Sequence, residues 1–158
     1  MTHNHRAHDR PHLDDVSKAI IEQLQQDGRR SYAAIGKVVG LSEAAVRQRV
    51  QRLLDAGVMQ VVAVTDPLEL GFARQAMVGI RVMGRLEPVA DALAELSEVD
   101  YVVITAGSYD LLAELVCESD DHLLSLISGK IRTIEGVVST ETFMYLRLRK
   151  QTYSWGVP

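Results

Sequence analysis

Arginine side chains gather in one short stretch of this sequence, VGLSEAAVRQRVQRLLDAGVMQ. Arg47, Arg49 and Arg52 stand there close together, although the whole chain of 158 residues has a formal net charge of -4. Guanidinium groups donate hydrogen bonds to phosphate oxygens and to the edges of bases. These residue types predict contact with a polyanion. The alternative is that the arginines only solvate the outer face of a helix.

The spacing of the apolar residues in this stretch predicts an amphipathic helix. Val46, Val50, Leu53 and Leu54 fall on one face, which we expect to be buried. Polar and small side chains then fall on the outer face or beside it, and these are the residues predicted to contact DNA: Ser42, Glu43, Ala44, Arg47, Gln48, Arg49, Gln51 and Arg52. Within that set, Arg47, Gln48 and Gln51 are suited to reading bases, whereas Arg49 and Arg52 are suited to phosphates.

Two further helices are predicted before this one. Residues 13–27 have an apolar stripe behind two aspartates, and the next helix begins after Ser31 and ends at Gly40. A Gly-Leu-Ser turn then leads into the arginine-rich helix, with Ser42 as its N-cap. Three helices, the last two joined by a tight turn, predict a helix-turn-helix domain over residues 13–62.

The bulk composition narrows the class of protein. Residues 1–65 hold nine Lys/Arg against seven Asp/Glu, and residues 66–158 hold eight against fourteen, so only the front half suits a polyanion. No apolar stretch is long enough to span a membrane, and a single cysteine fits a reducing compartment. We expect a cytoplasmic, nucleoid-associated protein.

Residues 1–12 contain four histidines without a closed ligand set, so we expect a disordered tail and no metal.

The second half of the chain alternates strand and helix signals. A β-branched strand is expected over residues 58–65, a linker over 63–73, and a C-terminal tail over 151–158. Residues 74–150 follow the order βαββαβ, with strands at 75–82, 99–106, 111–119 and 136–150 and helices at 86–97 and 120–134. This order predicts a ferredoxin-like α+β domain with both helices on one face of an antiparallel sheet.

The predicted strands are apolar on both faces. Tyr101 and Val103 alternate with Val102 and Ile104, so neither face of that strand is polar. The face away from the helices therefore needs a cover, and a second copy of the chain would supply one. A homodimer would also bring two DNA-reading helices to two half-sites.

Three segments, LDDVSKAIIEQLQQDGR, GLSEAAVRQRVQRLLDAGVM and TAGSYDLL, resemble the Lrp/AsnC (leucine-responsive, feast/famine) family of transcriptional regulators in their order and separation. The resemblance runs from Leu13 to Leu148. It implies a winged helix-turn-helix followed by a ferredoxin-like domain that dimerises and often forms tetramers or octamers. It also implies an amino acid or related small molecule as effector. Ser17 departs from the acidic residue that is more frequent in the family.

The effector site implied by the resemblance lies in the loop after residue 104. Backbone N–H groups exposed by a positive φ at Gly107 would suit a carboxylate, and Asp110 an ammonium group. The candidate residues are Thr105, Ala106, Gly107, Ser108, Tyr109 and Asp110, with Thr140 and Thr142 of a neighbouring subunit as the opposite wall. The alternative is a plain, tight hairpin turn at GSYD in which Asp110 caps its own backbone.

No residues of this sequence form a catalytic pattern. Cys117 is expected in the core, and His122 has no partner carboxylate or serine at a suitable spacing. Phosphate-loop, dinucleotide and zinc motifs are absent from the sequence, so we expect no enzyme activity and no cofactor. Two other functions stay open: an architectural DNA-binding protein without an effector, and a regulatory module whose front helices bind protein.

Overall fold

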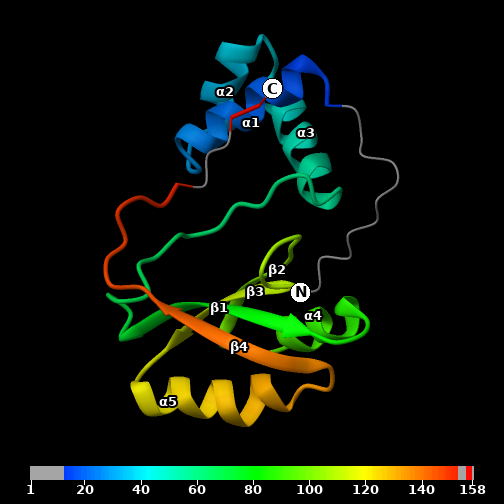
Figure 1. Cartoon of the computed structure of the whole chain (residues 1–158). Coiled ribbons are helices and arrows are strands. Elements are labelled where there is room, and N and C mark those ends of the chain that lie inside the picture. The colour runs from blue at the N-terminus through cyan, green and yellow to red at the C-terminus, as the bar shows by residue number, and fades with distance from the viewer. Residues whose placement is uncertain (1–12, 153–155, 158) are drawn as a thin grey trace. The chain divides into compact units, whose positions relative to one another are not determined.

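The computed structural model describes residues 13–152 and 156–157, and the expected tail at residues 1–12 lies outside this range. Contacts divide the described chain into two compact units (Figure 1). One contains the described residues up to Val64 together with those after Arg149, and the other is Thr65–Arg149. None of the helices in the described residues is long and apolar enough to cross a bilayer.

The first unit contains α1 (Asp15–Gln26), α2 (Tyr32–Val39) and α3 (Glu43–Asp55). Each helix begins after a side-chain cap, and these caps accept hydrogen bonds from backbone N–H groups in the first turn: Asp14, Ser31 and Ser42. The amphipathic faces meet in a core of buried side chains from all three helices, which are Ile20, Leu24, Ile35, Val46 and Val50. The three predicted helices are therefore confirmed.

The turn between α2 and α3 depends on a close approach of two backbone segments. A Cβ built on Gly36 would lie 2.4 Å from the carbonyl oxygen of Leu41, so only glycine fits there. Gly40 has a φ of 72°, and the N–H of Leu41 donates to the carbonyl of Gly36. This geometry holds the start of α3 against the end of α2.

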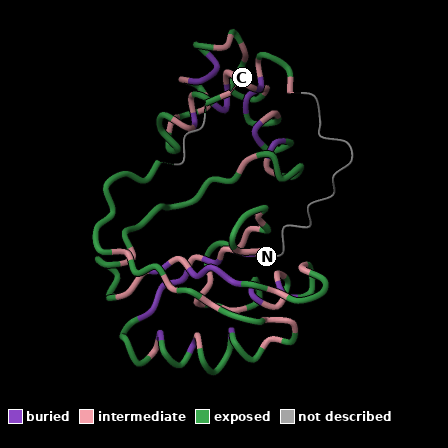
Figure 2. The backbone as a smooth tube through the Cα atoms, in the orientation of Figure 1, coloured by how far each residue is buried: buried purple, intermediate pink, exposed green. Residues whose placement is uncertain are grey.

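The strand expected over residues 58–65 is not formed. This segment runs from the end of α3 without regular structure, and Val61, Val62 and Val64 are all more than half exposed (Figure 2). Its β-branched residues favour extended backbone, but no strand among the described residues pairs with it. The wing expected after the third helix is accordingly absent from the described chain.

The second unit is built on an antiparallel sheet in the order β2-β3-β1-β4. Its strands are β1 (Arg74–Val82), β2 (Val99–Ile104), β3 (Leu111–Cys117) and β4 (Val137–Met144). The helices α4 (Leu86–Ala94) and α5 (Asp120–Ser125) contribute Val89, Leu93 and Leu123 to one core with the sheet. The ferredoxin-like α+β fold predicted from the sequence is confirmed.

Several boundaries differ from the predictions, and α4, for example, ends at Ala94 and not at residue 97. The helix expected over 120–134 is α5 followed by a π-helical turn, Leu126–Lys130, and a 3₁₀ turn, Ile131–Thr133. The last strand ends at Met144, six residues before the expected end. Finally, β2 and β3 are joined by a six-residue loop, 105–110, and not by a tight turn.

The strand register divides the sheet into a helix-covered face and an open face. Directly paired residues of neighbouring antiparallel strands point to the same side. Buried Val78 and Ala113 therefore define the covered face. Two cross-strand rows lie on the open face: Tyr101, Glu114, Met77 and Phe143, and next to it Val103, Leu112, Gly79 and Glu141.

Candidate nucleic-acid interface and regulatory surfaces

The α3 helix presents a polar surface opposite its buried one. Val46, Val50 and Leu53 are at most 6% exposed, so the orientation of the helix is fixed by the core. All of the exposed residues of α3 except Asp55 belong to the set predicted to contact DNA, and with the cap they are Ser42, Glu43, Ala44, Arg47, Gln48, Gln51 and Arg52. The hydroxyl of Ser42 accepts from the N–H of Ala45, so its first role is to cap the helix.

Arg47 lies against its own domain at the start of α3. Its Nη2 is 2.6 Å from Oε1 of Glu43, one turn earlier, and its guanidinium lies 5.2 Å from the ring centroid of Tyr32 in α2. Both side chains of the ion pair are more than half exposed. An exposed pair of this kind contributes only about 0–1 kcal/mol. Arg47 can therefore leave Glu43 for a phosphate or a base at small cost.

Arg49 is engaged within its own domain, whereas the sequence predicted a contact between this residue and a phosphate. Its Nη1 donates to both carboxylate oxygens of Asp14, at 3.0 and 2.7 Å, and to Oγ of Ser17 at 3.1 Å. The side chain is 32% exposed and ties α3 to the first turn of α1. Hydrogen bonds from Ser17, and then from Arg49, lower the pKa of Asp14 to about 2.

The remaining polar residues of α3 differ in whether their side chains form hydrogen bonds within the protein. Gln51 donates from Nε2 to Oδ1 of Asp55 at 2.8 Å, which holds its amide along the helix axis. Gln48 and Arg52 are exposed and form no side-chain hydrogen bond or ion pair among the described residues. The outer face of α3 thus has a small side chain at Ala44 and free donors further along the helix.

The loop 105–110 is held by its own hydrogen bonds. Oγ1 of Thr105 donates to the carbonyl of Tyr109, and the N–H of Thr105 donates to the carbonyl of Asp110. Oδ2 of Asp110 accepts from the N–H of Val82 at 2.8 Å, so this carboxylate anchors the loop to β1. One carboxylate oxygen of Asp110 therefore binds backbone. This is similar to the capping role that the plain-hairpin alternative gave to Asp110, except that the bound N–H belongs to β1.

Gly107 does not adopt the positive φ expected from the sequence. The loop reverses over six residues, and such a reversal does not need a left-handed residue at that position. The exposed residues of the loop tip are Ala106, Gly107 and Ser108. Their backbone N–H groups form no hydrogen bond within the described residues, so they are available to an anionic group.

Tyr109 crosses from this loop onto the open face of the sheet. Its ring lies over Gly79 and meets Phe143 edge to face, with centroids 5.9 Å apart. The guanidinium of Arg81 is 5.8 Å from the ring centroid, and the hydroxyl donates to the carboxylate of Glu141. The loop is thereby connected to both β1 and β4.

Thr140 and Thr142 do not lie on this side of the sheet. They pair directly with Ile80 and Val78, so they belong to the covered face, whereas Glu141 between them lies on the open face. The β4 side chains that the structure brings to the loop are thus Glu141 and Phe143. The prediction concerned Thr140 and Thr142 of a neighbouring subunit, and it stays a prediction.

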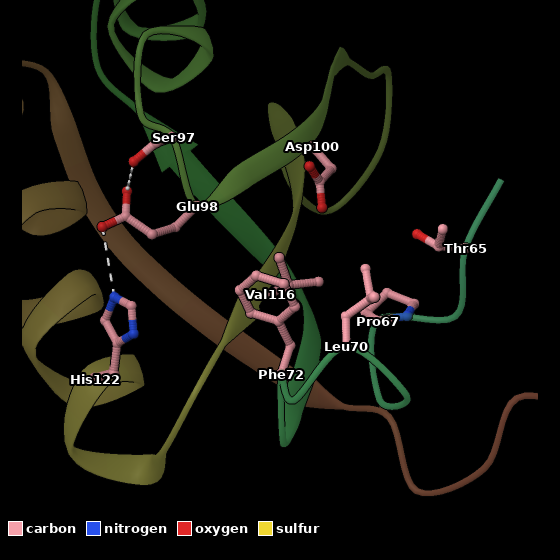
Figure 3. Close-up of a pocket in the computed structure, with 9 residues that line it drawn as sticks. All are labelled: Thr65, Pro67, Leu70, Phe72, Ser97, Glu98, Asp100, Val116 and His122. Atoms are coloured by element: carbon pink, nitrogen blue, oxygen red, sulfur yellow. Dashed lines mark hydrogen bonds and ion pairs between the residues drawn. The ribbon is translucent and has the colours of Figure 1, made fainter. Parts of the chain in front are cut away.

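A separate pocket of about 450 Å³ opens near the start of β2 (Figure 3). The residues that line it come from the turn before β1, the β2 start, the β3 end and α5: Thr65, Pro67, Leu70, Phe72, Ser97, Glu98, Asp100, Val116 and His122. None of these was predicted as a site residue, because they come from four separate segments. Within the described residues, no cluster of His, Cys, Asp and Glu is arranged to hold a metal ion.

Glu98 organises the charged end of this pocket. Its Oε1 accepts from Nζ of Lys130 at 2.6 Å and lies 3.5 Å from Nε2 of His122. The hydrogen bond from Lys130 is the main cause that lowers the pKa of Glu98 to about 2. His122 therefore has a carboxylate partner, contrary to the prediction, which considered sequence spacing alone.

Comparison with known proteins agrees with this architecture. Residues 13–54 match the AsnC-type helix-turn-helix domain, and residues 73–158 match an AsnC-type C-terminal dimeric α+β barrel domain. A helix-turn-helix transcriptional regulator of Pyrococcus furiosus is 35% identical over 144 residues, which cover 90% of this chain and 97% of that protein.

Two solved structures have the same fold. The leucine response regulatory protein LrpA of Mycobacterium tuberculosis superposes with a TM-score of 0.83 at 26% identity, over 92% of this chain and 100% of that one. A Neisseria meningitidis transcriptional regulator, solved in complex with L-methionine, gives 0.78 at 22% identity, over 93% and 97% of the two chains. The matched domains belong to regulators and not to enzymes. The chain belongs to the Lrp/AsnC family of DNA-binding transcriptional regulators.

Proposed function

We propose that this regulator reads specific sequences in duplex DNA through the outer face of α3, and that an amino acid or related small molecule controls its assembly or its DNA affinity. The observation that carries the DNA-reading part is the division of α3 into a buried valine-leucine face and an exposed polar one. A helix held in this way can enter the major groove with its first turns leading.

The proposal assigns different roles to the side chains of α3. Ala44 permits close approach and offers a methyl group to a thymine methyl, while Gln48 supplies a carboxamide for a base edge. Arg47 and Arg52 would contact phosphates or guanine. Glu43 holds Arg47 in free protein and would accept from a cytosine amino group in the complex.

The test of DNA binding is the salt dependence of affinity for duplex DNA. Contacts to phosphates release counterions, so affinity falls steeply as salt rises. Arg47→Ala and Arg52→Ala should each weaken binding, while Arg132→Ala, an exposed arginine of the second unit, serves as the matched control. Equal affinities for all three variants would reject the assignment of α3 and favour a protein-binding role for the front helices.

The effector part of the proposal concerns the loop 105–110. Its tip offers unengaged N–H groups of Gly107 and Ser108 to a carboxylate, and the second oxygen of Asp110 is available to an ammonium group. The related Neisseria protein was solved with L-methionine, which motivates amino acids as the first ligands to screen. We add Glu141 to this site, because its carboxylate accepts from the hydroxyl of Tyr109, and we keep Thr140 and Thr142 of a neighbouring subunit as the proposed opposite wall.

A thermal-shift panel of the amino acids tests the effector. A ligand that binds only the native state raises the melting temperature by mass action. The shift should be lost in Asp110→Ala and kept in Asp91→Ala, which alters an exposed carboxylate on α4. A panel without any shift would support the ligand-independent, architectural alternative instead.

The same proposal includes a homodimer formed through the open face of the sheet, and assembly of dimers into tetramers or octamers. Support comes from the match to a dimeric domain and from the exposed apolar side chains of that face, where Tyr101 is 51% and Phe143 44% exposed. We also propose a cytoplasmic, nucleoid-associated location, which follows from action on DNA.

A further inference from the structure

The pocket beside β2 is used by neither the DNA contact nor the effector loop. It adjoins the first residues of β2, whereas the loop 105–110 follows the last residue of that strand. A strand rises about 3.3 Å per residue, so the two sites are about 15–20 Å apart along β2. A ligand in the pocket would therefore be a second ligand of the same domain.

The floor of the pocket is apolar. Val116 lies on the open side of β3 and yet is only 8% exposed. Phe72 also lines the pocket, together with Pro67 and Leu70 of the turn before β1 (Figure 3). Leu70 remains 62% exposed, so an apolar body bound here would remove hydrophobic surface from water. The volume of about 450 Å³ suits a small organic molecule.

The rim of the pocket has unbalanced negative charge. The carboxylate of Glu98 forms an ion pair with Lys130 and lies beside the ring of His122, so its charge is already balanced. Asp100, by contrast, forms no ion pair among the described residues. Asp100 is exposed at the rim, where partial desolvation, and then the nearby charge of Glu114, raise its pKa. Both effects disfavour the ionised carboxylate of Asp100, and a cation bound beside it would stabilise that carboxylate.

We propose that this pocket binds a small organic monoamine, that is, an ammonium group on an aliphatic or aromatic body without a carboxylate. The ammonium group pairs with Asp100, with the hydroxyl of Thr65 as a second acceptor on the rim. The body lies on Val116 and Phe72. A free amino acid is disfavoured because its carboxylate would meet Asp100, Glu98 and Glu114.

The experiment is calorimetric titration of the full-length chain with 2-phenylethylamine and with L-phenylalanine, which differ only by the carboxylate. We expect saturable binding of the amine at the pocket and at least about tenfold weaker binding of the amino acid there. Asp100→Asn should weaken amine binding about tenfold, and Asp91→Asn should leave it unchanged. The effector loop is monitored separately through Asp110→Ala, which should not alter amine binding.

A second pair of variants tests the position of the bound amine. Both keep the charged residues of the pocket unchanged and add one lysine. Leu70→Lys places a competing ammonium group at the wall, whereas Leu68→Lys changes a residue of the same turn that is 57% exposed and lies outside the pocket. Only the first should abolish binding. No saturable heat with the amine, or equal effects of the two lysine variants, would overturn the proposal, and neither result bears on DNA binding.

Discussion

The ring of Tyr109 occupies the space where a side chain of Gly79 would be. A Cβ built on Gly79 would lie 2.6 Å from Cγ of that ring, and Gly79 itself is buried in the middle of β1. The loop between β2 and β3 can therefore pack on the open face of the sheet only because residue 79 is a glycine. The contact between Tyr109 and Gly79 therefore connects the loop proposed to bind the effector with the face proposed to form the dimer.

Gly79→Ala should displace Tyr109 and destabilise the second unit. Overpacking of this kind costs about 1–3 kcal/mol in free energy of unfolding. Urea unfolding at fixed protein concentration measures the loss, and Gly107→Ala is the control, because a Cβ there meets nothing within 4 Å. In a Tyr109→Ala background the effect of Gly79→Ala should become much smaller. Additive effects of the two substitutions would show that they do not act through one contact.

Substitutions of Arg49 and Arg52 should have different effects, although both residues lie on α3. The first should lower the stability of the helical unit and the second its affinity for DNA. Arg49→Ala breaks the contacts to Asp14 and Ser17, so it should lower the urea midpoint of the helical unit. Arg52→Ala should leave that midpoint unchanged and reduce the slope of log affinity against log salt by about 1. Both variants are compared at one salt concentration by fluorescence anisotropy with duplex DNA. A stable Arg49→Ala protein with the larger loss of slope would restore the phosphate role predicted for Arg49.

The depressed pKa of Asp14 predicts acid sensitivity of the helical unit. Its pKa is about 2 when folded against a usual value of 3.8, so the ionised carboxylate stabilises the folded state above about pH 4. That contribution is lost as the pH falls from about 4 to 2, because protonation weakens the hydrogen bonds that Asp14 accepts from Ser17 and then from Arg49. Helix content followed by circular dichroism should show this loss. Asp14→Asn should show a smaller dependence over the same range, while Asp15→Asn, on the next residue, should behave as the unaltered chain.

The helical unit could be predicted closely because its signals are local. Ser31 and Ser42 are caps that act within three residues, and the apolar spacing of α3 alone determines which of its faces is buried. The role of Arg49 could not be predicted in this way. Its partner Asp14 is 35 residues away in sequence, and only the packing of α1 on α3 brings them together.

The fold of the second unit was also predictable, whereas its sites were only partly so. The alternation of strands and helices gave the βαββαβ order, but the face on which a β4 residue lies depends on its partner in β1. Glu141 pairs with Gly79 and so lies beside Tyr109, and no local pattern shows this pairing. The pocket around Asp100 was missed because its walls come from separate segments that no local pattern connects.

The open face of the sheet should be the surface at which two chains associate. Phe143 is 44% exposed there, and a glutamate in its place would add an unpaired carboxylate to a face that already has Glu114 and Glu141. Phe143→Glu is therefore expected to shift the dimer toward monomer in sedimentation at micromolar concentration. Leu124→Glu alters a residue of α5 that is 65% exposed, outside the open face, and it should remain dimeric. Because paired α3 helices are needed for two half-sites, Phe143→Glu should also lose affinity for a two-site duplex more than for a single half-site. A monomer in the unaltered chain, or a dimer that tolerates glutamate at position 143, would place the interface elsewhere.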